Sequence, residues 1–142
     1  MTIPLEIQRA TEEFDRFLAT ARDEAGLATR NQTYTMVEGV LVTFRRRLDF
    51  AEAIRFAGIL PPVLRAIFVA NWDLDEAKQP FLSRQVLTEE VQSLRKDHNF
   101  APDSAISDVT KALRAHMDQK ELDAVLAQLP PQAGDYWGIS SN

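Results

Sequence analysis

The tripeptide Leu-Pro-Pro occurs twice in this sequence, at residues 60–62 and again at residues 129–131. The first proline of each pair cannot donate a backbone hydrogen bond, and its ring disfavours the helical conformation of the leucine before it. The second proline is well suited to the first turn of a new helix. Each tripeptide therefore predicts a corner between two helices, with its leucine in the core. The predicted corner residues are Leu60, Pro61, Leu129 and Pro130.

The segments on either side of these corners repeat their apolar residues with the period of an α-helix, and none alternates like a half-buried strand. The first such segment predicts a helix over Pro4–Ala25, stopped by Gly26. The stretch 27–33 is polar and predicts a loop. Thr35 and Glu38 have the spacing of a capping box, so we predict that the second helix begins there.

A third helix is predicted over Phe50–Ile59, because Asp49 and Glu52 form another capping box just before it. Pro62 then opens a fourth helix directly after the corner. Residues 71–80 are polar and acidic, and they predict a connector. Further helix starts are predicted at Pro80 and at Thr88.

The two Leu-Pro-Pro tripeptides belong to longer segments that match each other. A shift of 69 residues, without a gap, places Met36–Phe68 on Ala105–Trp137. The apolar face, the acidic caps at Asp49 and Asp118, and the two corners then coincide, and this conjunction indicates an internal duplication. We therefore predict an all-α fold, a compact bundle of about seven or eight helices in one domain. Its parts are pseudo-repeat one at about 33–72, a connector with short helices at about 73–102, and pseudo-repeat two at about 103–138.

The first of these units carries four features in order, which are Arg47-Leu48, Glu52-Ala53, Leu60-Pro61 and Trp72. A weaker second set consists of Met117, Glu121 and Gln128-Leu129-Pro130. Together they resemble a bacterial family catalogued only as a domain of unknown function, over roughly residues 33–138. The sequence departs from that pattern at Ile59, where the family prefers Gln, and at Pro62, where a single proline is usual. The resemblance implies an all-helical fold and assigns no activity.

The sequence offers little material for catalysis. It contains no cysteine, which excludes disulfides, thiolate metal sites and cysteine nucleophiles, and which fits a reducing compartment. Its two histidines, His98 and His116, lack the spacing of a metal site, and no nucleophile elbow or phosphate-binding loop occurs. We therefore predict no catalytic residue, no cofactor and no metal site, and we expect a protein that is not an enzyme.

The run Arg45-Arg46-Arg47 lies at the C-terminal end of the predicted second helix, within a basic segment of a chain whose net charge is −5. Cations at this end of a helix complement its dipole, each by about 0.3–1 kcal/mol at exposed positions. The alternative is a basic patch for nucleic acid or another anion, joined by Arg55 and Arg65. Three adjacent residues span nearly a full helical turn and cannot all face one ligand, so nucleic-acid binding is the minor hypothesis.

Three aromatic residues, Trp72, Tyr136 and Trp137, end the two pseudo-repeats. Aromatic side chains in this position either plug the end of a helical bundle or anchor a partner protein, and the sequence leaves both readings open. The candidate interaction residues are therefore Trp72, Tyr136, Trp137, Arg45, Arg46 and Arg47.

These observations favour a non-catalytic module that binds a partner protein or a second copy of itself. An alternative is a protein that binds an apolar or anionic small molecule in a pocket between helices, and a third is a weak nucleic-acid regulator. The N-terminus has no signal-peptide pattern, and no apolar run approaches the ~20 residues that a membrane span needs. We therefore expect a cytoplasmic protein with no membrane partner.

Overall fold

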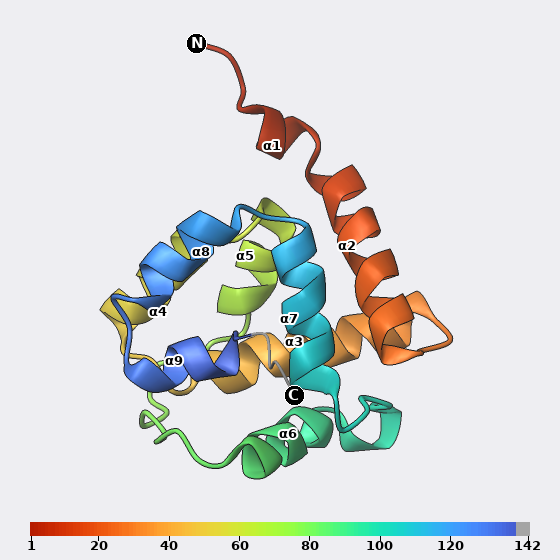
Figure 1. The fold of residues 1–142 in the computed structure, drawn as a ribbon, viewed down its shortest axis with the longest axis vertical. Helices are drawn as coiled ribbons and strands as arrows, with labels where there is room; N and C mark the ends of the chain where they lie inside the picture. Colours follow the sequence, from red (N-terminus) through yellow and green to blue (C-terminus); the bar gives the residue numbers. More distant parts are fainter. Residues whose placement is uncertain (139–142) are drawn as a thin grey trace.

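A computed structural model describes residues 1–138, and this part of the chain is all-helical, as predicted (Figure 1). It contains nine α-helices and one short 3-10 helix, and no strand occurs among the residues described. The helices are α1 (Leu5–Gln8), α2 (Ala10–Ala25), α3 (Arg30–Arg45), α4 (Phe50–Ile59), α5 (Pro62–Val69), α6 (Arg84–Ser93), η1 (Lys96–His98), α7 (Ala105–Ala115), α8 (Gln119–Leu126) and α9 (Pro131–Tyr136).

The predicted first helix is divided in two. Arg9 separates α1 from α2 with φ −103° and ψ 15°, so the single helix predicted over Pro4–Ala25 is wrong. The residues of α1 are all exposed, so this single turn buries no side chain that would stabilise it as a continuation of α2. The predicted end is confirmed, because Gly26 takes the left-handed conformation (φ 68°) that closes α2.

The predicted start of the second helix is also wrong. A capping box does open α3, but Thr29 and Gln32 form it, six residues before Thr35 and Glu38. Both pairs have the same spacing, and the earlier pair opens the helix because the buried face extends that far back. Thr33 is completely buried and donates its hydroxyl to the Thr29 carbonyl.

The helix starts predicted at Pro80 and Thr88 are wrong as well. The Pro80 carbonyl accepts a hydrogen bond from Arg47 Nε (3.2 Å), which fixes this stretch against the end of α3. Ser83 caps α6 instead, by accepting from the Val86 amide. Thr88 lies inside α6 and donates its hydroxyl to the Arg84 carbonyl (2.8 Å).

The structure places both Leu-Pro-Pro tripeptides at junctions between helices. The first joins α4 to α5, and the second joins α8 to α9. Leu60 is 1% exposed and Leu129 is 7% exposed, so both leucines lie in the core. Helices α4 and α8 begin 69 residues apart, as do α5 and α9, and each proline pair opens the following helix. Helix α4 packs against α8, and α3 against α7. That these halves arose by duplication stays a prediction.

The core is centred on aromatic side chains from both halves. Phe44 lies 4.8 Å from Phe56 and 5.0 Å from Tyr136, measured between ring centroids. Trp137 stacks on Phe56 at 5.5 Å. The C-terminal end of α9, with Tyr136 and the following Trp137, therefore closes the core.

The N-terminal arm, residues 1–13, extends away from this core (Figure 1). The C-terminal part of α2 packs on α7 and α3, whereas the start of α2 and all of α1 reach beyond the bundle. No helix within residues 1–138 has the length and apolar character needed to cross a membrane. The arm carries large exposed apolar side chains, which are Met1, Ile3, Leu5 and Ile7.

Candidate functional site

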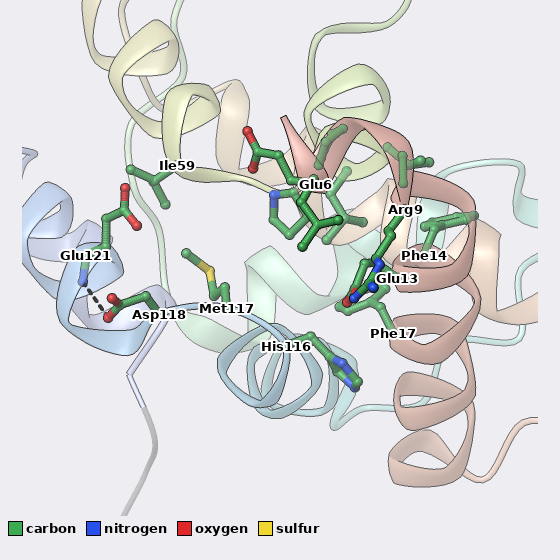
Figure 2. Close-up of a pocket in the computed structure, with 16 residues that line it drawn as sticks. Glu6, Arg9, Glu13, Phe14, Phe17, Ile59, His116, Met117, Asp118 and Glu121 are labelled. Carbon is green, nitrogen blue, oxygen red and sulfur yellow. Dashed lines mark hydrogen bonds between the residues drawn. The ribbon is translucent and has the colours of Figure 1, made fainter. Parts of the chain in front are cut away.

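The candidate site is a groove between the N-terminal arm and the body of the bundle, with a volume of about 340 Å³ (Figure 2). Helices α1 and α2 form one wall. The first Leu-Pro-Pro corner and the start of α5 form the second wall, and the turn between α7 and α8 closes one end. The predicted corner residue Pro61 therefore also lines the groove.

Apolar side chains make up much of both walls. Phe17 and Leu64 are each 2% exposed and form the base, because they belong to the core as well as to the groove. Above them lie half-buried side chains that the bundle only partly covers. These are Phe14, Ile59, Pro61, Pro62, Val63 and Met117.

Acidic groups surround this apolar surface. Glu6 lies on the arm, whereas Asp118 and Glu121 lie on the opposite side of the groove, at the start of α8 (Figure 2). Glu13 is a fourth carboxylate and pairs with Arg16 at 2.6 Å. Among the described residues, Arg9 is the one arginine or lysine that lines the groove. The described walls therefore carry an excess of negative charge.

His116 is fixed in the wall of the groove. Its Nε2 lies 2.7 Å from the Thr20 hydroxyl, and its ring meets the edge of Phe17 at 6.3 Å. These contacts join the end of α7 to α2. No cluster of three or more metal-ligating side chains occurs in residues 1–138.

Two of the arginines considered for a basic patch, Arg45 and Arg65, form internal contacts, whereas Arg55 is exposed. Arg45 is 4% exposed, and its Nη1 donates to the carbonyls of Phe68 (2.9 Å) and Ala70 (3.0 Å). Arg65, also proposed for the patch, donates to the Ala57 carbonyl (3.0 Å) inside the corner. Both side chains therefore donate to backbone carbonyls of the first half and do not present a cationic surface.

Arg46 and Arg47 join α3 to the connector and to α6. Arg47 is 3% exposed and forms a two-pronged ion pair with Glu90, one arm of which is 2.9 Å long. Arg46 reaches Glu76 at 3.1 Å and Glu90 at 3.5 Å. Burial raises the pKa of Glu90, but its hydrogen bonds to Arg47 and the two positive charges outweigh this and lower the pKa overall.

The two C-terminal aromatic residues lie inside the protein. Trp137 is fully buried and Tyr136 is 2% exposed, and the Tyr136 hydroxyl donates to the Val40 carbonyl at 2.6 Å. Burial raises the pKa of Tyr136, so this phenol keeps its proton. Both side chains therefore plug the bundle, and the alternative of a surface anchor at these two positions is wrong because neither is accessible.

Trp72 differs from them, because it is only half-buried. Its ring lies over the guanidinium of Arg45 at 5.0 Å and against the exposed Phe50 at 5.3 Å. Asn71, immediately before it, has φ 54°, a left-handed conformation that asparagine tolerates and that turns the chain at this point. Trp72 is thus the predicted aromatic residue that remains accessible.

No motif in the sequence points to the groove. The helix predicted over Pro4–Ala25 includes the arm, although Ile3, Leu5 and Ile7 are spaced by two residues. Residues spaced by two cannot all lie on one buried face of a helix. This spacing therefore indicates that some apolar side chains of the segment stay exposed. The opposite wall comes from two distant segments, which a single sequence cannot bring together.

Comparison with known proteins gives a family and no function. A search of curated proteins found no match. The family model described as "Uncharacterized conserved protein (DUF2267)" matches residues 14–136, which include the body of the bundle and exclude the N-terminal arm. This chain therefore belongs to the DUF2267 family of uncharacterised conserved proteins.

Proposed function

We propose that this protein is a protein-binding module whose groove holds an amphipathic, positively charged helical segment of a partner protein. The observation that carries the proposal is the combination of apolar walls and an acidic rim in one groove. Partner helices commonly bind with their apolar face in such a groove, and charges at the rim select the partner and speed association.

The N-terminal arm supports the same reading. Leu5 lines the groove, yet 58% of its surface is exposed, and Ile3 and Ile7 beside it are exposed by 61% and 47%. A partner helix seated in the groove would cover the arm and the corner together. The apolar area gained would stabilise the complex by roughly 25 cal/mol per Å² before the costs of association.

Charge favours a cationic partner over the other candidates. A second copy would bring the same carboxylates of Glu6, Asp118 and Glu121 to the interface, in a chain whose net charge is −5. Nucleic acid would meet this acidic rim as well, while Arg45 and Arg47 are buried in internal contacts. A second copy as the occupant is kept as one outcome of the test.

The test is a calorimetric titration of the full chain with a designed amphipathic helical peptide bearing leucine on one face and lysine on the other. A peptide with glutamate in place of each lysine is the matched control. We expect the lysine peptide to bind and the glutamate peptide to bind at least tenfold more weakly. Equal binding of the two peptides would overturn the proposal.

A double variant locates the binding. Glu6→Gln with Glu121→Gln removes two exposed rim charges and leaves the Asp118 cap of α8 in place. We expect about fivefold weaker binding of the lysine peptide and a smaller dependence on salt. Unchanged binding would exclude this groove, and concentration-dependent dimers that the lysine peptide cannot dissociate would favour a second copy as its occupant.

A further inference from the structure

A second cavity, of about 280 Å³, lies where the connector folds back over the end of α3. It brings together three of the residues singled out in the sequence, which are Arg45, Arg46 and Trp72. Phe50, Leu74 and Lys78 also line it. This cavity is separate from the groove beside the arm, and the residues that line the two are different.

Arg45 is a buried cation without a buried anion. Both of its hydrogen bonds go from Nη1 to neutral carbonyls, and its Nε is buried with no hydrogen-bond partner. None of the ion pairs within residues 1–138 includes it, whereas the neighbouring Arg46 pairs with Glu76. Burial and, next, the charge of Arg46 lower the pKa of Arg45. A buried donor without an acceptor is costly, and an incoming anion would supply what is missing.

The other half of the molecule contains the same arginine with its anion present. Arg114 follows Arg45 by 69 residues and donates from Nε and Nη2 to the Trp137 carbonyl, which is equivalent to the Phe68 carbonyl. It also pairs with Asp123 at 2.9 Å. Asp123 is the fifth residue of α8, and the fifth residue of α4 is Ile54. The first half therefore lacks the carboxylate that neutralises the arginine of the second half.

The rest of the cavity suits an apolar group. The Trp72 ring lies over the Arg45 guanidinium at 5.0 Å, and Phe50 meets that ring edge-on at 5.3 Å. Phe50 and Leu74 are 54% and 67% exposed at the rim. Of the two acids in the lining, Asp49 caps α4 and Glu76 pairs with Arg46. The charge of Glu76 acts to raise the pKa of Arg45, but neither acid forms an ion pair with it.

We propose that this cavity binds a small organic carboxylate, whose charged group pairs with the guanidinium of Arg45 and whose apolar part packs against Trp72, Phe50 and Leu74. Lys78, at the rim, adds a second positive charge for the incoming anion. The proposal does not depend on the function assigned to the groove.

Phenylacetate is the probe, and its neutral isostere phenylacetamide is the matched control. Binding is followed through the indole N–H signals of the two tryptophans in ¹⁵N-edited NMR spectra, with Trp72→Phe used to assign them. We expect a saturable shift of the Trp72 signal with phenylacetate and at least tenfold weaker binding of phenylacetamide. Equal affinity, or no saturable shift, would overturn the proposal.

The contact of Asp123 with Arg114 suggests a pair of test variants at Ile54, the corresponding position of α4. Ile54 is 69% exposed, so Ile54→Asp and Ile54→Asn should both fold, and an unchanged Trp137 signal verifies this. The aspartate should form an ion pair with Arg45, as Asp123 does with Arg114, and should weaken phenylacetate binding at least tenfold. The asparagine variant should bind within about twofold of the natural chain. Equal effects of the two substitutions would contradict the assignment of Arg45 as the anion site.

Discussion

The two halves of the bundle, α3–α5 and α7–α9, solve the same structural problem in different ways. In both, a buried arginine at the end of the first helix donates to the carbonyl at the end of the third, from Arg45 to Phe68 and from Arg114 to Trp137. In the second half Asp123 completes the contact, whereas in the first half no carboxylate is in contact with Arg45 and Trp72 covers its guanidinium. The same order of helices can therefore hold its buried arginine with a carboxylate partner, as in the second half, or without one, as in the first.

Trp72 and Trp137, which end the two halves, differ in their exposure. Trp137 is fully buried among Phe44, Phe56 and Tyr136, while Trp72 is half-buried beside a cavity. A side chain that only completes the core has no reason to remain accessible. The contrast therefore separates a residue that stabilises the fold from one that is available to a ligand.

Truncating the two tryptophans tests this contrast with the largest expected effect. Trp137→Ala should lower the free energy of unfolding by about 3–5 kcal/mol, because it empties the centre of the core. Trp72→Ala should cost only about 1–2 kcal/mol, from partial burial and the contact with Arg45. Urea denaturation of both variants measures the difference, and equal losses would show that Trp72 is as structural as Trp137.

The two corner leucines should behave alike if the halves share one frame. Leu60→Ala and Leu129→Ala should each lower the free energy of unfolding by about 2–5 kcal/mol, since both leave a cavity in the core. The loss at Leu60, which is 1% exposed, should be the larger of the two. A near-zero effect in either urea-denaturation experiment would remove that corner from the core.

The Arg47–Glu90 pair, which joins α3 to α6, and the Arg114–Asp123 pair of the second half should differ in their contribution to stability and in its pH dependence. Glu90→Gln should cost about 1–3 kcal/mol, because it leaves the buried Arg47 without its anion. The folded-state pKa of Glu90 is lower than the ordinary value near 4.3, so its contribution is complete above about that pH and is lost as the pH falls through the folded-state pKa.

Unfolding free energies measured from about pH 6 to pH 3 check this prediction. The natural chain should lose stability more steeply on acidification than Glu90→Gln, and parallel curves would contradict the assigned role of the pair. The smallest effect is expected for Asp123→Asn in the second half. Because the Asp123 side chain is 60% exposed, removing its charge should cost less than about 1 kcal/mol.

Local sequence signals predicted some of these features and not others. The proline corners and the Asp49 cap follow from residues next to one another, and the structure has helix boundaries at those positions. The start of α3 did not follow, because two capping boxes of identical spacing compete and only tertiary packing decides between them.

The burial of the arginine run could not be predicted from neighbouring residues either. Helix-end charge was a sound expectation for Arg45 and Arg47, but their burial depends on residues 68–80 folding back over α3, and on Glu90 arriving from α6. The groove depends in the same way on an arm, a corner and a turn that are distant in the chain. Periodicity describes each helix, and it says nothing of which helix ends meet.

The Nε–H groups of Arg45 and Arg114 report most directly on the difference between the two halves, and they can be observed separately in ¹⁵N-edited spectra. We predict that addition of phenylacetate shifts the Nε–H signal of Arg45, which has no partner, and leaves that of Arg114 in place, because it already donates to the Trp137 carbonyl at 2.9 Å. Signals that move together, or an Arg45 signal that does not move at all, would contradict the distinction between a half whose arginine has a carboxylate partner and a half whose arginine has none.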